Sequence, residues 1–134
     1  MARRLAEVAR ARGLVLLIAA DPDLAHRVGA DGVHWPQRLA PEARGPGLVT
    51  AAAHDAAGLA HAAHMGADAC VLGPVFVTRS DSGNSPLGLF RASQLARAAQ
   101  LPVIALGGVN AKSAARLSGR GFAGLAAVDA MLGA

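Results

Sequence analysis

The segments ACVLGPVF, from Ala69 to Phe76, and LPVIALGGVN, from Leu101 to Asn110, decide the fold of this chain. Each is a short apolar run that leads directly into glycine. A strand buried on both faces of a parallel sheet is continuously apolar rather than alternating. Glycine just beyond such a strand lets the backbone approach a ligand closely. The pair therefore predicts a β/α protein that binds a small phosphorylated molecule where its strands end.

A repeated signature precedes three of the expected strands. It reads GADGVHW from Gly29, GADACVL from Gly66 and GRGFAGLAAV from Gly119. In each copy a helix ends at glycine, which takes the left-handed conformation without penalty, and a strand follows. Such repetition indicates successive αβ units and a parallel sheet.

The remaining patterns predict alternating helices and strands. The expected helices are Ala2–Arg12, Pro22–Val28, Ala56–Met65, Arg91–Ala99 and Ala111–Ser118, the last with Asn110 as its N-cap. The expected strands are Leu14–Ala19, Gly32–Trp35, Leu48–Ala52, Ala69–Leu72, Val103–Leu106 and Gly124–Val128. A long loop runs from Gly73 to Leu87, and the tail DAMLGA is expected to begin a further helix. These are about six strands, whereas a closed (β/α)₈ barrel needs eight in roughly 200 residues or more.

Composition places the chain among single-domain globular proteins. Its 134 residues are 53% hydrophobic and 3% aromatic, which suits close helix–strand packing and one domain over residues 1–134. The longest strongly apolar run, Leu14 to Ala20, is too short to span a membrane. The basic N-terminus lacks the apolar core of a signal peptide. The single cysteine, Cys70, fits a small buried apolar residue in a reducing cytoplasm, where we expect the protein to act.

The net charge of +4 invites a nucleic-acid interpretation, but the pattern of charges argues against it. No aromatic side chains are interleaved for base stacking. The arginines are scattered along the expected helix faces as Arg3, Arg4, Arg10, Arg12, Arg91, Arg97, Arg116 and Arg120. We interpret them as solvated helix faces and expect no nucleic-acid partner.

Beyond these patterns, the chain resembles a known family. The order GADGVHWPQ, AAHD, GADACVLGPVFVTRS, SPLGLF, LPVIALGGVN and GLAAVDAM is similar to that of the thiamine phosphate synthase and thiazole tautomerase family. The resemblance runs from about Gly13 to the C-terminus and implies an α/β fold of the (β/α)₈ barrel type. Relative to that barrel, we expect the chain to be incomplete and to lack the first two strands.

The family's synthase joins an aminopyrimidine pyrophosphate to a thiazole phosphate and releases pyrophosphate with the help of Mg²⁺. The positions that correspond to the family's metal carboxylates are occupied by Ala20 and Leu39, so the resemblance implies no metal ligands here and makes Mg²⁺ doubtful. Asp21 and Asp23 lie nearby. They read either as the start of a helix, where carboxylates satisfy free N–H groups, or as a relocated metal site.

The resemblance also implies a phosphate and substrate site. It would be formed by Gly107, Gly108, Gly73, Thr78, Arg79 and Gln37. Asp81 replaces a family lysine and Asp129 replaces a family serine beside the expected phosphate. A carboxylate next to phosphate is repulsive by about 1 kcal/mol or more, so part of the phosphate site is altered. Arg79 either compensates, because arginine binds phosphate with two N–H groups, or is a solvated loop residue.

His54 corresponds to the histidine thought to move a proton on the thiazole ring in the family's tautomerases. Histidine suits this role because its pKa is near neutral. The alternative is that His54 caps the following helix or packs at the barrel rim. His34 is expected to be a structural rim residue, and the pair His61 and His64 to lie on an exposed helix face rather than to bind a metal.

Three functional hypotheses follow. The first is a thiamine phosphate synthase-like protein of thiamine biosynthesis, with weak or no synthase activity for this chain alone. The second is a tautomerase-like enzyme or an inactive remnant that binds a phosphorylated thiazole or pyrimidine ligand. The third, an aldolase-type enzyme, is disfavoured because the only lysine, Lys112, lies on a helix. Open sheet edges lead us to expect one of three outcomes: a homo-oligomer that covers the edges, a poorly soluble product, or a coding start placed too late.

Overall fold

The computed structural model describes residues 1–79 and 83–132. Its six strands form one parallel sheet in the order β1-β2-β3-β4-β5-β6. The strands are β1 (Leu17–Ala19), β2 (Gly32–Trp35), β3 (Leu48–Ala53), β4 (Ala69–Leu72), β5 (Val103–Ala105) and β6 (Gly124–Leu125). The helices are α1 (Ala2–Ala11), α2 (Pro22–Val28), α3 (Ala56–His64), α4 (Leu89–Ala98) and α5 (Ala111–Leu117), with 3₁₀ turns η1 (Gln37–Leu39) and η2 (Asp129–Met131).

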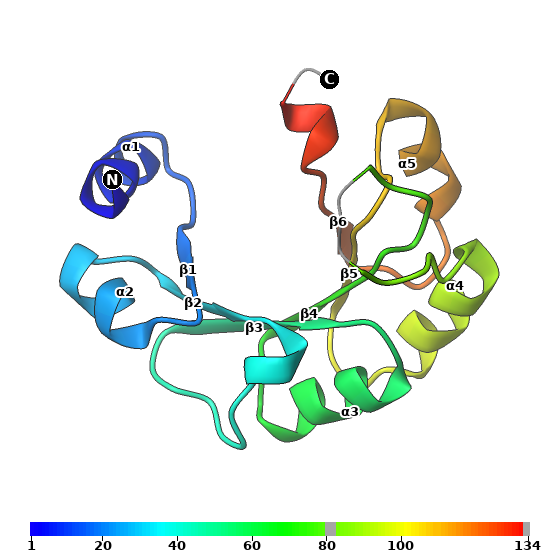
Figure 1. Cartoon of the computed structure of the whole chain (residues 1–134), viewed down its shortest axis with the longest axis horizontal. Helices are drawn as coiled ribbons and strands as arrows, with labels where there is room; N and C mark the ends of the chain where they lie inside the picture. The colour runs from blue at the N-terminus through cyan, green and yellow to red at the C-terminus, as the bar shows by residue number, and fades with distance from the viewer. Residues whose placement is uncertain (80–82, 133–134) are drawn as a thin grey trace.

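The strands lie side by side in the order in which they occur in the chain, as in a β/α barrel. Figure 1 shows the sheet as an arch with the helices along its outer side. The N-terminal helix and the C-terminal turn stand on opposite sides of the opening. Among the described residues, β1 pairs only with β2 and β6 only with β5. The expected fold, an incomplete barrel of about six β/α units, is confirmed.

The core lies between the sheet and the helices. Strand residues that face the helices are at most 1% exposed in β3, β4 and β5, and they are Val49, Ala51, Ala53, Cys70, Leu72, Val103 and Ala105. Residues of the same strands that face the inside of the arch, such as Ala52, Val71 and Ile104, are half-buried. Both faces are apolar, which is why the strands read as continuous apolar runs. Burial raises the pKa of the Cys70 thiol to about 12, so the predicted buried apolar role is confirmed.

Three helices begin at side chains that accept hydrogen bonds from the first turn. Asp21 accepts from the Leu24 N–H at 2.8 Å, and Asp55 accepts from the Gly58 N–H at 2.8 Å. Asn110 caps α5 as expected. Asp21 therefore serves as a helix cap, as one of the two interpretations held. The glycines of the repeated signature, at 29, 66 and 119, all have positive φ, in agreement with the expected left-handed turns.

The structure differs from expectation mainly at the two edges of the sheet. The first strand begins at Leu17 rather than at residue 14, and the last ends at Leu125 rather than at residue 128. Leu14 and Val15 are 61% and 65% exposed. An apolar run forms a strand only where a neighbouring strand supplies hydrogen bonds, and each edge has a neighbour on one side. The tail forms the short turn η2 over the described part, and residues 133–134 lie outside the described residues.

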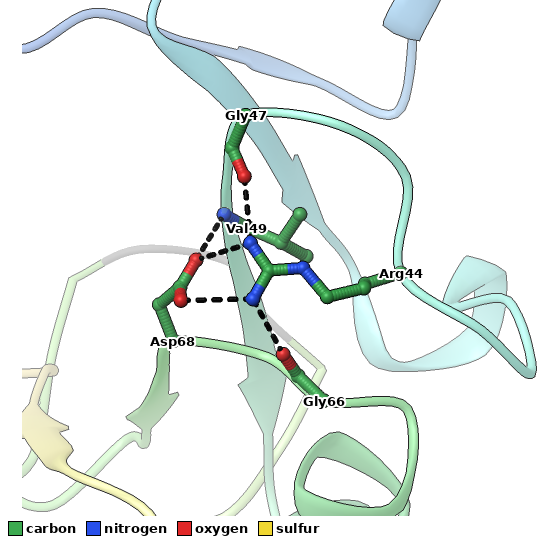
Figure 2. Close-up of polar contacts among 5 residues, drawn as sticks. All are labelled: Arg44, Gly47, Val49, Gly66 and Asp68. Atoms are coloured by element: carbon green, nitrogen blue, oxygen red, sulfur yellow. Dashed lines mark hydrogen bonds and ion pairs between the residues drawn. The ribbon is translucent and has the colours of Figure 1, made fainter.

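Arg44 ties together the N-terminal ends of two central strands (Figure 2). Its guanidinium forms two hydrogen bonds of 2.9 Å with the Asp68 carboxylate and also donates to the carbonyls of Gly47 and Gly66. Asp68 in turn accepts the Val49 N–H at 2.8 Å. The cluster lies at the end of the sheet opposite the glycine-rich turns, where barrel residues serve stability.

Within residues 1–79 and 83–132, no helix has the length and apolar character needed to cross a membrane.

Candidate functional site

A cavity of about 130 Å³ lies at the C-terminal ends of β3, β4 and β5 and against the segment that follows β6. Its walls are largely apolar side chains and glycine backbone. The polar side chains in its lining are His54, Thr78 and Asp129. The C-terminal end of the strands is where β/α barrels place their active sites. Five predicted site residues thus line one cavity, namely His54, Gly73, Thr78, Gly107 and Gly108.

Gly107 and Gly108 are required by the packing of two loops. Their φ angles are +99° and +63°. A Cβ on Gly108 would lie 2.3 Å from the carbonyl oxygen of Val77, and one on Gly107 would lie 2.5 Å from the Cα of Pro74. These approaches are closer than real Cβ atoms allow, and the obstructing atoms include backbone. The glycines therefore hold the turn after β5 against the loop after β4, which shapes the cavity.

The turn at Gly107 and Gly108 leads into the start of α5, and free N–H groups at a helix start can bind an anion. In the structure, Asn110 Oδ1 accepts from the N–H groups of Lys112 at 2.9 Å and Ser113 at 3.0 Å. The Ser113 hydroxyl also accepts from the Asn110 N–H and donates to the Gly108 carbonyl. Three N–H groups at this helix start, those of Asn110, Lys112 and Ser113, are thus satisfied within the protein. An anion in this region needs other donors.

A second hollow, of about 180 Å³, adjoins the cavity and shares Thr78, Gly108, Val109 and Asp129 with it. Arg79 and Asn110 complete its polar lining. Arg79 is exposed, so its guanidinium can reach an anion placed there. The structure thus brings Arg79 and Asp129, of opposite charge, to the same hollow. The expected charge reversal at Asp81 lies outside the described residues.

His54 follows β3 and is fixed by the end of the next strand. Its Nδ1 lies 2.7 Å from the carbonyl oxygen of Gly73. A carbonyl oxygen only accepts hydrogen bonds, so Nδ1 carries the hydrogen, and in the neutral ring Nε2 is the basic nitrogen. The helix-capping alternative for His54 is wrong, because Asp55 caps α3. Capping needs a short oxygen-bearing side chain directly before the helix, and Asp55 occupies that position.

Gln37 lies in η1, beside the turn between β3 and α3. Its Oε1 accepts the His54 backbone N–H at 2.7 Å, and its Nε2 donates to Asp55 Oδ1 at 3.3 Å. Both ends of the amide are therefore bonded to the protein next to the cavity. Sequence reasoning missed Asp55, although an aspartate directly before the first residue of an expected helix is a recognisable cap.

The expected metal positions carry no ligand side chains. Ala20 follows β1 with φ +51°, and Leu39 is 49% exposed. Asp21 beside Ala20 is engaged as the cap of α2. Over residues 1–79 and 83–132 there is no group of three or more His, Cys, Asp or Glu that could hold a metal. The residues present do not fit the family's Mg²⁺ site.

Two other histidines are held by structural contacts. His34 Nδ1 lies 2.8 Å from Thr50 Oγ1, and burial lowers the pKa of His34 below its usual value. His61 Nε2 lies 3.2 Å from the Ala40 carbonyl and 3.1 Å from the Pro41 carbonyl. The expectation of an exposed face is wrong for His61, which is half-buried, and right for His64. The loop after η1 folds onto α3 and covers His61.

Comparisons with known proteins agree with this arrangement. A family model described as thiamine monophosphate synthase matches residues 1–131. The chain is 41% identical to the thiamine biosynthesis bifunctional protein ThiM/ThiE of Symbiobacterium thermophilum, over 99% of this chain and 29% of that protein. It is 35% identical to the thiamine-phosphate synthase of Laribacter hongkongensis, over 97% of this chain and 64% of the relative.

Solved structures show the same architecture. The thiamine phosphate pyrophosphorylase of Pyrococcus furiosus superimposes with a TM-score of 0.82 at 24% identity, over 95% of this chain and 63% of that one. The chain therefore spans less than two thirds of the length of these relatives. The match over nearly all of its own residues shows that the chain belongs to the thiamine monophosphate synthase family.

Proposed function

We propose that this chain acts in thiamine biosynthesis as a thiamine-phosphate synthase-like protein whose cavity binds the phosphorylated thiazole. The observation that carries the proposal is the cavity at the ends of β3, β4 and β5, lined by His54, Gly107 and Gly108. Its volume of about 130 Å³ is well below the roughly 300–1,000 Å³ of sites for drug-sized ligands. Such a cavity suits one small ring, with the phosphate in the adjoining hollow.

The synthase reaction requires, besides a thiazole site, assistance to the departure of pyrophosphate. Pyrophosphate departure is assisted in the family by Mg²⁺, and the residues at positions 20 and 39 do not fit that ion. We therefore expect weak or absent coupling of the two substrates by this chain alone. A synthase assay with both substrates and Mg²⁺ checks this, and coupling at an ordinary enzymatic rate would refute it.

A second candidate, proton transfer on the bound thiazole ring, is favoured by His54. With Nδ1 bonded to the Gly73 carbonyl, the neutral ring retains Nε2 as its base. Nε2 would take a proton from one ring position of the ligand and return it to another, so that the imidazole ends unchanged. Tautomerase activity that is lost in His54→Ala would support this candidate, and activity that persists would exclude it.

Ligand binding is tested by calorimetric titration with thiazole phosphate. Asp129 lines the hollow in which we place the phosphate, so Asp129→Ser should tighten binding by about 1 kcal/mol, or about fivefold in Kd. Glu42→Gln, at an exposed loop position, removes the same charge elsewhere and should leave the Kd unchanged. Weak binding that is equal in all three proteins would place the phosphate elsewhere.

We extend the proposal to the cellular location and the oligomeric state of the protein. Enzymes of small phosphorylated metabolites act where those metabolites are made, so we place the protein in the cytoplasm. We also propose that it forms a homo-oligomer that covers apolar side chains at the sheet edges, such as Leu14 at 61% and Val128 at 54% exposure.

A further inference from the structure

Gln37 connects η1 to the turn between β3 and α3, which lies 17 and 18 residues further along the chain. It extends from η1 to the backbone of His54 and to the side chain of Asp55. Asp55 Oδ1 accepts both from Gln37 and from the Gly58 N–H in the first turn of α3. The amide is thus part of one hydrogen-bond network with the start of this helix.

The Gln37 amide packs directly against Gly58 of α3. A Cβ on Gly58 would lie 2.5 Å from Gln37 Oε1 and 2.7 Å from its Cδ. Gly58 is buried, and α3 has a glycine at the point where the Gln37 amide packs against it. Glycine within a helix costs about 0.5–1 kcal/mol relative to alanine, so its presence in α3 fits a packing requirement.

The ring of His54 has a second, separate partner. Its Nδ1–H donates to the Gly73 carbonyl just after β4, whereas the backbone N–H of His54 donates to Gln37 Oε1 in η1. Neutral imidazole in water carries its hydrogen mainly on Nε2, so the tautomer required here is the less common one. A backbone that moved at residue 54 would carry the ring away from the carbonyl that imposes this tautomer.

We propose that Gln37 is the positioning residue for His54, and that it holds the backbone so that Nδ1–H binds Gly73 and Nε2 is the proton acceptor for a ligand in the cavity. This inference rests on the proposed function for the ligand, but the tautomer itself does not depend on a ligand. Gln37 then contributes to proton transfer on a heteroaromatic ring by acting through His54.

The test is the ¹⁵N NMR spectrum of the histidine side chains, which distinguishes protonated from unprotonated ring nitrogens. In the unsubstituted protein above the titration range of histidine, His54 should show a protonated Nδ1. His61, whose Nε2 faces two carbonyl oxygens, should show the opposite tautomer in the same spectrum. His61 is therefore an internal reference for the assignment and for the integrity of α3.

Two substitutions separate positioning from folding. Gln37→Leu removes both hydrogen bonds, and His54 should change from a single tautomer to a mixture dominated by protonated Nε2. Gln37→Met also removes both hydrogen bonds, with a side chain of nearly the original length, and should give the same mixture. Thr50→Val, which removes the partner of His34, is the matched control and should leave His54 unchanged.

The outcomes are decisive in both directions. A single Nδ1–H tautomer in Gln37→Leu would overturn the positioning role, and a protonated Nε2 in the unsubstituted protein would overturn the geometry itself. If Gln37→Leu does not fold, Gln37→Met decides, because it removes the same two hydrogen bonds at nearly the original side-chain length, and a single Nδ1–H tautomer there would equally overturn the positioning role. Correct tautomers without thiazole phosphate binding would refute the proposed function and leave the role of Gln37 intact.

Discussion

Ala20 is the one non-glycine residue with a positive φ among residues 1–79 and 83–132. A left-handed conformation costs alanine about 1–2 kcal/mol, whereas glycine adopts it freely. Ala20→Gly should therefore stabilise the protein by about 0.5–1 kcal/mol, after the greater freedom of glycine in the unfolded chain is subtracted. Urea unfolding measures the change as a higher midpoint at an unaltered slope.

The control for this substitution is Ala43→Gly, in an exposed loop. It adds the same unfolded-state freedom without relieving a positive φ, so it should destabilise slightly. Equal destabilisation by both substitutions would mean that the backbone at residue 20 is not held in the left-handed region.

For single residues, the sequence predicts local roles such as helix capping better than it predicts contacts with distant parts of the chain. Asn110 is recognisable as a cap from its type and position, and Asp21 as the more ordinary of two alternatives. The roles of Gln37 and Gly108 are different, because they depend on atoms from other elements, namely the His54 N–H and the Val77 carbonyl. The resemblance implied a ligand at both residues, and the contacts that the structure gives them are with other parts of the protein.

At the scale of elements, the Arg44 cluster joins the loop before β3 to the turn before β4 (Figure 2). A planar guanidinium binds both carboxylate oxygens and two carbonyls at once, and an ammonium group does not reproduce this geometry. Because the side chains of Arg44 and Asp68 are both more than a third exposed, Arg44→Lys should lower the free energy of unfolding by about 0.5–1 kcal/mol. Arg38→Ala, at another exposed arginine, should change it by less than about 0.5 kcal/mol.

The same cluster gives a pH dependence. Hydrogen bonds from Arg44, and then from the Val49 N–H, hold the pKa of Asp68 below its ordinary value. A lowered pKa in the folded state adds stability above the unfolded pKa of about 3.9, and this stability is lost as the pH falls through the folded pKa. The difference in unfolding free energy between the unsubstituted protein and Asp68→Asn should thus be constant above about pH 5 and shrink in more acidic buffer. A difference that is the same at pH 3 and pH 7 would contradict this assignment.

The central elements are those that the sequence predicts best. The β3 and β4 strands have neighbours on both sides, so an apolar run is sufficient to identify them. At the edges, the apolar runs at residues 14–19 and 124–128 continue beyond the observed strands, because exposed backbone there has one neighbour only. Local sequence carries no information about a missing neighbour.

At the scale of the whole molecule, the sheet has exposed apolar side chains near both edges. Beside β1, Leu5 and Val8 of α1 are 51% and 49% exposed. Beyond β6, Met131 and Leu132 are 80% and 76% exposed. Open strand edges and exposed apolar surface favour association, either into a defined oligomer of this chain or into disordered aggregates.

We therefore expect purified protein to elute from gel filtration at a multiple of its mass of 13.4 kDa. Leu5→Glu with Val8→Glu places charges on the exposed apolar face of α1, and it should shift the protein to a smaller species because burying those carboxylates is costly. Arg3→Ala with Arg4→Ala changes the net charge by the same amount on the same helix and should leave the elution volume unchanged. A stable, well-folded monomer before any substitution would show that six strands with two open edges suffice alone, and the proposed assembly would be wrong.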